Sequence, residues 1–362
     1  MVARTPGPLN TGVVMALASA ALFGASTPFA KRLLGEGVDP WLLAGLLYLG
    51  SGLGLSGLRL ALRREFAAAN SEASLRRGDL PVLGLVVLLG GAIGPVLLMW
   101  GLTRTSASSA ALLLNAEGIA TMVIAWVVFR ENVDRRLLAG AAAIIGGAVV
   151  LSWRGGPEGV GLGALAILGA CMAWGADNNL TSRLSWADPT QIAIAKGLAA
   201  GGVNVVIAFA MGAATPTGAA AVQAALLGFL GYGLSLVLFV QALRRLGAAR
   251  TGAYFSTAPF IGAALAVVLL GDRVTAQLLI AGALMAIGVY LHLSERHEHE
   301  HEHSPLTHAH RHTHDAHHEH IHAAGESVSE PHSHTHHHGV MRHRHPHYPD
   351  LHHRHGHGHG GR

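Results

Sequence analysis

The stretch WGADNNLTSRL, from Trp174 to Leu184, has the pattern of FGASTPFAKRL, from Phe23 to Leu33, much earlier in the chain. In both stretches an aromatic residue and a glycine precede a short polar group, and an arginine followed by a leucine ends the match. Weak internal similarity of this kind is a typical sign of a repeated structural unit in membrane proteins. The pattern therefore indicates that the second half of the chain repeats the first.

Two further matches follow in the same order along the chain. VDPWLLAG, from Val38, corresponds to ADPTQIAI, from Ala187, and residues 102–152 can be laid over residues 243–293 without a gap. In the longer match, Gly147 meets Gly288. One match between apolar segments is weak evidence, but three matches in one order indicate a duplication.

The composition places both halves in a membrane. Of the 362 residues, 51% are apolar and only 13% are charged, whereas a soluble protein carries about 25% charged residues. A run of about 20 apolar residues spans the hydrocarbon layer as a helix. Counting such runs predicts an all-α polytopic membrane protein with ten transmembrane helices, near 11–30, 40–60, 80–101, 107–129, 136–153, 160–182, 189–211, 220–242, 249–270 and 275–294.

Five helices in each half predict an inverted repeat. Because five is odd, the second half enters the membrane in the opposite orientation to the first, as in many secondary transporters. We expect a short N-terminus over 1–10, repeats over 11–154 and 155–294, and a tail over 295–362. Two such halves can open a shared central site to either side in turn, although a duplicated scaffold or a membrane enzyme has the same pattern.

The distribution of Lys and Arg predicts the orientation. If the N-terminus is cytoplasmic, the basic clusters within 59–77, 130–136 and 244–250 are cytoplasmic too, and the outer segments hold fewer basic residues. The positive-inside rule then places both termini in the cytoplasm. The first apolar run has no clear cleavage site and is read as a retained helix. Abundant Ala, Gly and Arg favour a bacterial inner membrane.

The ten helices, the two halves and the acidic residues that close the fourth and ninth helices resemble the EamA-type transporters of the drug/metabolite transporter superfamily. The acidic positions read FRENVD, with Glu131, and LGDRVT, with Asp272. The family commonly has a small residue followed by Glu here. The second half departs from this pattern with Asp272 in place of Glu, and the first half lacks the glycine before Glu131. The resemblance covers about residues 10–295 and implies transport of metabolites, amino acids or drugs.

Two charged residues lie inside apolar runs. Glu117, in LLLNAEGIATMVIAW (Leu112 to Trp126), is about ten residues or roughly 15 Å along its helix. Lys196 lies roughly 11 Å from the cytoplasmic end of the seventh helix, at a similar depth. Charge at that depth costs about 2.5–3.5 kcal/mol and faces the protein interior or a cavity. We expect both to line one central cavity, with Glu117 coupling proton movement, or to form a structural ion pair.

Matched polar groups in the repeats predict the rest of the cavity. Ser26-Thr27-Pro28 and Asp177-Asn178-Asn179 occupy corresponding positions, and matched breaks of this kind point to transporter sites. Both groups are also explained as ordinary helix ends. The predicted cavity-lining set is Glu117, Lys196, Asn115, Asp177, Asn178, Ser26, Thr27, Tyr232, Tyr254 and Gln241.

The tail has a different composition, with all 26 histidines at or after His292. Its apolar content is too low for a core, so we expect disorder. Imidazole is largely neutral near pH 7 and binds Zn, Ni, Co or Cu. Without cysteine or a fixed spacing, the tail predicts many weak metal sites, or a dispensable extension. The candidate ligands are His297, His299, His301, His303, His308, His310, His312, His314, His332, His334 and His336.

Three functions are compatible with this sequence. The first is a secondary transporter of a small organic solute, a monomer or homodimer, that requires no cofactor and carries a metal-binding or regulatory tail. The second is a divalent-metal transporter fed by the tail, and the third is a membrane metal buffer that transports nothing. No glycine loop ending in Gly-Lys-Ser/Thr is present, so ATP-driven transport is not supported. Nothing resembles a catalytic triad, and we expect neither enzymatic activity nor a nucleic-acid partner.

Overall fold

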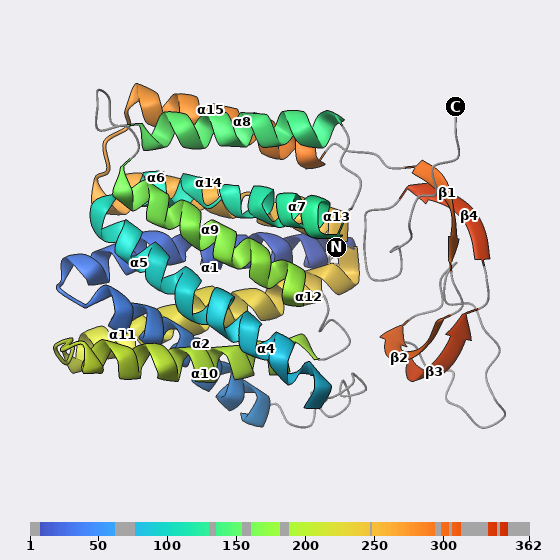
Figure 1. Cartoon of the computed structure of the whole chain (residues 1–362), viewed down its shortest axis with the longest axis horizontal. Helices are drawn as coiled ribbons and strands as arrows, with labels where there is room; N and C mark the ends of the chain where they lie inside the picture. The colour runs from blue at the N-terminus through green and yellow to red at the C-terminus, as the bar shows by residue number, and fades with distance from the viewer. Residues whose placement is uncertain are drawn as a thin grey trace, which may run out of the picture.

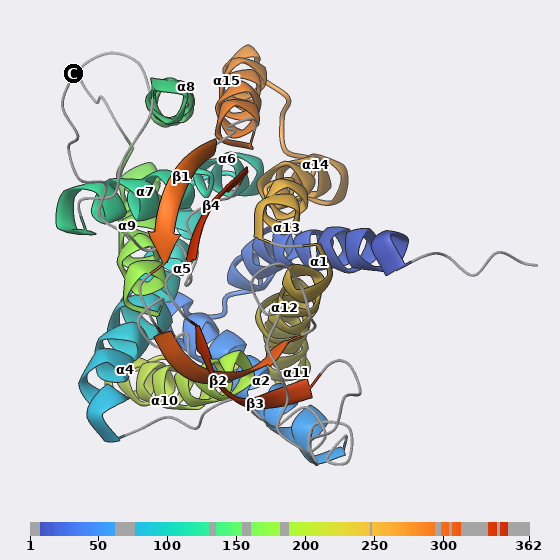
Figure 2. The ribbon, with the colours of Figure 1, turned by 90° about the vertical axis from the view of Figure 1, so that its right-hand side faces the viewer.

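The fold is a bundle of long helices that run roughly along one direction, with two small pairs of strands beyond one end (Figure 1). The computed structural model describes residues 8–61, 77–129, 135–153, 161–181, 188–246, 248–293, 298–303, 306–312, 332–338 and 341–346. Viewed from that end, α8 and α15 form a separate edge of the bundle (Figure 2).

Each predicted transmembrane run corresponds to one helical segment, and several segments consist of consecutive pieces. The first half contains α1 (Pro8–Gly35), α2 (Pro40–Ala61), η1 (Arg77–Asp79), α4 (Leu80–Val86), η2 (Val87–Ile93), α5 (Gly94–Arg104), α6 (Ala107–Leu113), α7 (Ala116–Phe129) and α8 (Arg135–Ser152). The second half contains α9 (Leu162–Thr181), α10 (Pro189–Ala210), α11 (Gly218–Gly228), η5 (Phe229–Leu234), α12 (Ser235–Leu246), α13 (Ala248–Phe255), α14 (Ala258–Leu270) and α15 (Ala276–Leu293).

Eight helical segments within the described residues are long and apolar enough to cross a membrane. The two remaining predicted spans are helical but differ from the other eight. The α9 helix is 20 residues long, but its last turns hold Asp177, Asn178 and Asn179, which lower its mean hydropathy. The α14 helix is apolar but only 13 residues long, because a turn separates it from α13. The architecture is that of a multi-pass membrane protein, and the number ten stays a prediction.

The outside of the bundle is apolar, as lipid requires. Val127, Val206 and Val268 are each at least two-thirds exposed. The buried interior is also apolar, with a continuous core that includes Leu47 and Leu98. A helix that is apolar on all sides is stable only in a protein core or in lipid.

The helix pairs stay the same when each helix is replaced by its counterpart in the other half. The α2 helix packs on α10, and α8 packs on α15, so each of these pairs joins corresponding helices. The α1 helix packs on α12 and α14, and its counterpart α9 packs on α5 and α7, which are the counterparts of α12 and α14. The duplication in the sequence is therefore also present in the packing.

In the contact between α8 and α15, corresponding residues of the two helices make corresponding contacts. A Cβ atom on Gly147 would lie 2.8 Å from the Met285 side chain and 2.9 Å from the Ala281 carbonyl. A Cβ atom on Gly288 would meet Ile144 and the Gly140 carbonyl, which occupy the corresponding positions of the first repeat. Small residues let membrane helices approach closely, because lipid offers no hydrophobic drive for their association.

Four stretches of the tail are paired as strands, and the disorder predicted for residues 295–362 stays a prediction. The strands β1 (Glu298–His303) and β4 (Met341–Pro346) form one antiparallel pair, and β2 (Leu306–His312) and β3 (His332–His338) form another. Strands are compatible with the alternating sequence of the tail, since a period of two matches the two faces of a strand.

Replacing Gly147 by alanine will destabilise the bundle, because the new methyl group overlaps α15. We expect a loss of about 1–3 kcal/mol, the usual cost of overpacking. Thermal unfolding of the purified protein in detergent measures the effect. Gly146→Ala is the matched control, because a Cβ atom there meets nothing within 4 Å. Equal melting temperatures for the two variants would contradict the close approach of α8 and α15.

Candidate functional site

The third helical segment of the first half changes its hydrogen bonding at η2. The N–H of Gly94 donates to the carbonyl of Leu89, five residues earlier, so this turn is wider than an α-helical turn. Pro95 follows and has no N–H to offer the carbonyl of Gly91. The carbonyls of Gly90 and Gly91 therefore take donors from outside their own helix, as buried backbone groups require. Wide turns of this kind occur frequently at functional sites.

Buried side chains from three other helices supply those donors. The Tyr48 hydroxyl of α2 donates to the Gly90 carbonyl at 2.6 Å, and the Trp174 indole N–H of α9 donates to the same oxygen at 2.9 Å. The Asn204 side chain of α10 donates to the Gly91 carbonyl at 3.2 Å. An unsatisfied backbone group in a bilayer costs several kcal/mol, so these bonds fix η2 against helices of both halves.

An ion pair between Lys196 of α10 and Asp177 of α9 lies directly against η2. The side chains are only 18% and 5% exposed, respectively, and the second Asp177 oxygen accepts a bond from the Thr181 hydroxyl at 3.3 Å. A Cβ atom on Gly90 would overlap both charged side chains. Glycine at this position is therefore what allows the ion pair to sit against the backbone.

The predicted fourth and ninth helices are both broken, at corresponding positions. The first break separates α6 from α7, and the second separates α13 from α14. At each break a polar side chain donates to a carbonyl three residues earlier, from Asn115 to Leu112 at 2.9 Å and from Thr257 to Tyr254 at 2.6 Å. Broken helices inside a membrane are tolerated where protein or a cavity satisfies their backbone, and in transporters they build the binding site.

Glu117 lies in the first turn of α7, immediately after the first break. It is half-buried, and one of its carboxylate oxygens accepts a hydrogen bond from the Asn178 side chain at 3.0 Å. The same Asn178 amide reaches the Thr121 hydroxyl at 3.2 Å. Glu117 also interacts electrostatically with Asp177 and Lys196. We name Glu117, Asp177, Asn178 and Lys196 the polar cluster.

The positions related to the polar cluster by the repeat have the same geometry without the charges. In the repeat alignment, Ala258, Ser26 and Leu47 correspond to Glu117, Asp177 and Lys196. Gly231 in η5 faces Ser26 as Gly90 in η2 faces Asp177. The centre of the bundle thus has one charged and one uncharged side, each built from residues of both halves.

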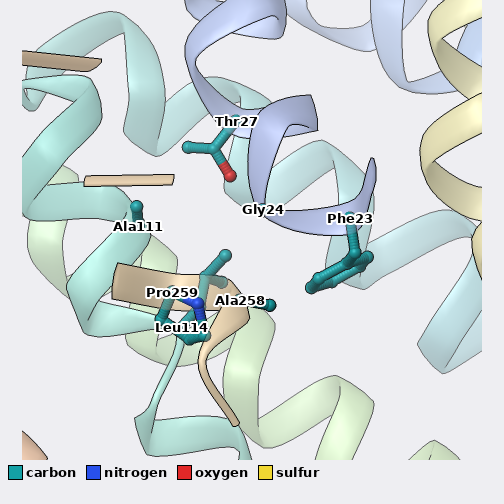
Figure 3. Close-up of a pocket in the computed structure, with 7 residues that line it drawn as sticks. All are labelled: Phe23, Gly24, Thr27, Ala111, Leu114, Ala258 and Pro259. Atoms are coloured by element: carbon teal, nitrogen blue, oxygen red, sulfur yellow. The ribbon is translucent and has the colours of Figure 1, made fainter. Parts of the chain in front are cut away.

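A small pocket occupies the uncharged side (Figure 3). It lies where α1 faces both helix breaks, and its lining is Phe23, Gly24, Thr27, Ala111, Leu114, Ala258 and Pro259. The lining is almost entirely apolar, and Thr27 supplies its polar side chain.

Aromatic rings connect the two sides. The Tyr48 ring lies 5.7 Å from the Tyr232 ring, and the Tyr232 ring lies 5.9 Å from the Phe23 ring. Tyr48 is bonded to η2 beside the polar cluster, and Phe23 lines the pocket. Packed aromatic pairs contribute about 0.5–1.5 kcal/mol beyond their buried area, so this row stiffens the centre.

The structure brings four of the residues predicted from sequence together in the polar cluster, but with different partners. The alternative in which Glu117 pairs with Lys196 is wrong, because Lys196 pairs with Asp177 and Glu117 is bonded to Asn178. The sequence placed Asp177 near a helix end, and the packing of both α9 and α10 against η2 decided its partner. Whether these residues bind a substrate stays a prediction.

The other predicted residues are distributed more widely. Asn115 is buried and contacts Met285 of α15 as well as its own turn. The Ser26 hydroxyl donates to the Phe23 carbonyl at 2.6 Å, and Thr27 lines the pocket. Tyr232 belongs to the aromatic row, Tyr254 is half-buried beside the second break, and Gln241 is exposed. Glu131 lies outside the described residues.

Tyr48, Trp174 and Asn204 were missed by the sequence analysis. The available signal was Pro95, because a proline within a predicted membrane helix predicts a carbonyl in need of a donor four residues earlier. The sequence does not say which helices pack against that carbonyl, so the donors themselves could be found only from the structure.

No group of three or more His, Cys, Asp or Glu side chains that could hold a metal ion occurs among the described residues. Of the predicted tail ligands, His297 and His314 lie outside the described residues, and the other nine lie in β1, β2 and β3. The metal-binding role of the tail stays a prediction.

Comparison with known proteins defines the class. The chain is 28% identical over 293 residues to an uncharacterized transporter of Methanothermobacter thermautotrophicus, covering 77% of this chain and 85% of that protein. It is 30% identical over 248 residues to a probable terminal-alkyne amino-acid exporter of Streptantibioticus cattleyicolor, covering 67% and 83%. These similarities, together with the helical bundle, identify a membrane transporter of small molecules.

The sequence profile of the EamA-like transporter family matches residues 10–153 and again residues 161–294. The chain therefore belongs to the EamA-like transporter family, as the resemblance in the sequence predicted. A solved crystal structure has the same fold, with a TM-score of 0.58 and 19% identity, covering 78% of this chain and 95% of that chain.

Removing one partner of the Lys196–Asp177 pair will destabilise the protein more than removing both. Asp177→Asn or Lys196→Gln alone leaves a buried charge uncompensated, which costs about 3–5 kcal/mol. The double variant removes both charges, so its loss of unfolding free energy will be clearly smaller than the sum of the losses in the two single variants. Unfolding in mixed detergent and SDS micelles gives the four free energies of the cycle.

The exposed pair Arg32–Glu36 is the matched control, with side chains 68% and 44% exposed. Its removal will change stability by no more than about 0.5 kcal/mol, the usual value for such pairs on helices. Additive effects at Asp177 and Lys196 would show that the two side chains do not interact.

Proposed function

We propose that this protein is a secondary transporter that moves a small organic metabolite or drug across the inner membrane by alternating access. The observation that carries the proposal is the polar cluster, which lies beside a broken helix at the junction of two reciprocally packed halves. Charged groups in a membrane are costly, and they mark substrate and ion pathways in transporters. Broken helices at the repeat interface are the usual construction of such a site.

The two halves form an inverted repeat in this proposal, with both termini in the cytoplasm. The reciprocal helix pairs and the glycine contacts of α8 and α15 support a two-fold relation between the halves. With five helices in each half, such a relation reverses the second half in the membrane. The ten helical segments then all span the bilayer, the 20-residue α9 by itself and the 13-residue α14 together with α13.

Contacts between the halves at both ends of the bundle act as the gates. At one end the Asp272 carboxylate accepts a bond from the Ser108 N–H at 2.8 Å, and Gln277 donates to the Trp153 carbonyl at 2.8 Å. At the other end Arg59 pairs with Asp188 at 3.2 Å. In an alternating cycle these contacts open one end at a time, and the packed halves move as rigid bodies.

Amino acids with short apolar side chains are the first substrates to test. One relative of similar length is a probable exporter of a terminal-alkyne amino acid. Among the residues that the structure describes, the Asn178 amide is the one hydrogen-bond donor to the Glu117 carboxylate, which therefore has capacity for an ammonium group. Lys196 binds the substrate carboxylate once its ammonium group has separated from Asp177. The pocket beside Phe23 binds the apolar side chain of the substrate.

Glu117 couples transport to protons, and the tail has a metal-binding or regulatory role. A carboxylate that binds a proton and the substrate in turn can link proton movement to substrate movement. Proton relays in membranes use Asp and Glu in this way. The tail is attached directly after α15, so metal bound there is positioned next to the cytoplasmic end of the bundle.

Glu117→Gln will abolish the dependence of transport on a pH gradient and lower the initial rate at least tenfold. The amide keeps the size and the hydrogen bond to Asn178 but carries no exchangeable charge. Uptake of labelled amino acids into inside-out vesicles, with and without a pH gradient, measures both effects. Glu36→Gln, at an exposed carboxylate, is the control and will leave the rate unchanged. A fully active Glu117→Gln protein would reject the coupling role.

Single cysteines will establish the inverted topology. With both termini in the cytoplasm, a cysteine at Asn70 will react with an impermeant maleimide only from the cytoplasmic side. A cysteine at Thr215, at the corresponding loop of the second repeat, will react only from the opposite side. The native Cys171 is buried and contributes little background. Labelling of both sites from one side would overturn the inverted repeat and alternating access with it.

A further inference from the structure

The hydroxyl group of Thr27 in α1 has no hydrogen-bond partner in the part of the chain that the structure describes. Thr27 is only 3% exposed, and Figure 3 shows its oxygen directed into the small pocket beside Phe23. Buried hydroxyl groups are normally bonded, because leaving one unpaired costs free energy. An unpaired hydroxyl in the wall of a pocket indicates that a ligand supplies its partner.

The helix that carries Thr27 does not satisfy this hydroxyl. A threonine in a helix often bonds a carbonyl three or four residues earlier, as Thr121 does with the Glu117 carbonyl at 3.0 Å. In α1 the Phe23 carbonyl, four residues before Thr27, is bonded by the Ser26 hydroxyl at 2.6 Å. The Thr27 oxygen points toward the pocket instead (Figure 3).

The other repeat shows which partners a polar side chain at this position can have. Thr27 corresponds to Asn178 of α9, because Ser26-Thr27-Pro28 matches Asp177-Asn178-Asn179. The Asn178 amide is bonded to the Glu117 carboxylate at 3.0 Å and to the Thr121 hydroxyl at 3.2 Å. In that copy the polar side chain is therefore satisfied by the neighbouring helix α7.

The copy around α1 lacks both of these partners. Ala258 and Gly262 of α14 occupy the positions that correspond to Glu117 and Thr121, and neither has a polar side chain. The pocket, which Ala258 lines together with Thr27, thus lies where the other copy has its hydrogen bonds. One hydrogen-bonding group is left in an otherwise apolar wall.

We propose that this pocket is a subsite for a short substrate side chain that carries a hydroxyl group, with Thr27 as the residue that determines specificity. A hydroxyl group both donates and accepts, so the substrate hydroxyl can pair with that of Thr27 in either direction. The apolar lining contacts the hydrocarbon part of the side chain. The inference rests on the proposed transport of amino acids and refines it, because it ranks side chains of equal size.

Threonine and valine test the subsite, because their side chains have the same shape and differ in a hydroxyl against a methyl group. Initial rates of uptake into inside-out vesicles give kcat/KM for each amino acid. For the wild-type protein we expect kcat/KM to be about tenfold higher for threonine than for valine, the value of one hydrogen bond. In Thr27→Val this preference will disappear.

Thr103→Val is the matched control, since Thr103 is exposed and its hydroxyl donates to the Trp100 carbonyl of its own helix at 2.7 Å. This variant will keep the wild-type preference for threonine. Equal kcat/KM values for the two amino acids in the wild-type protein, or an unchanged ratio in Thr27→Val, would overturn the subsite while leaving amino-acid transport intact. No uptake of either amino acid would reject the proposed transport of amino acids and the subsite with it.

A melting experiment without substrate tests the unpaired hydroxyl directly. Thr27→Val removes it without changing the size of the side chain, so the melting temperature of the purified protein in detergent will rise by about 2–4 °C. Thr103→Val will not produce this rise. A Thr27→Val protein that melts at or below the wild-type temperature would contradict the inference, because the hydroxyl would then have a partner in the empty protein.

Discussion

In a membrane, every buried polar group of this protein must find its hydrogen-bond or ionic partner within the protein. The largest group of such partners lies at Gly90, where the η2 backbone contacts the Asp177–Lys196 pair. The wide turn at η2 and Pro95 leave two carbonyls without ordinary helical donors, and Tyr48, Trp174 and Asn204 provide them. In lipid these bonds have no replacement from solvent. Helices of both halves are consequently fixed around one short segment, and the charged pair is held in a defined place.

The duplication explains the scaffold, and the differences between the copies explain the chemistry. Both halves have a wide turn, a glycine facing helix one or six, and a broken helix. Only one side has the polar cluster, since Ala258 and Ser26 replace the acidic residues on the other. A symmetric framework thus carries an asymmetric centre, with charges on one side and an apolar pocket on the other, which suits an amphipathic solute.

The tail follows a different rule, in which alternation takes the place of a core. The sequence there places His, Glu and Arg at alternate positions, and the strands form two antiparallel pairs, β1 with β4 and β2 with β3. The low apolar content predicts disorder for residues 295–362, which stays a prediction.

The sequence by itself determined the membrane class, the helical segments, the two repeats and the family, because these depend on hydropathy, length and internal similarity. It also selected Glu117, Asp177, Asn178 and Lys196, since charged and amide groups are conspicuous in apolar helices. Only the tertiary structure decided that Lys196 pairs with Asp177, that Tyr48 and Trp174 bind the η2 backbone, and that Gln241 lies exposed. Partner choice depends on which helix faces meet and how closely, and in a helix that is apolar all round no periodic pattern marks that face.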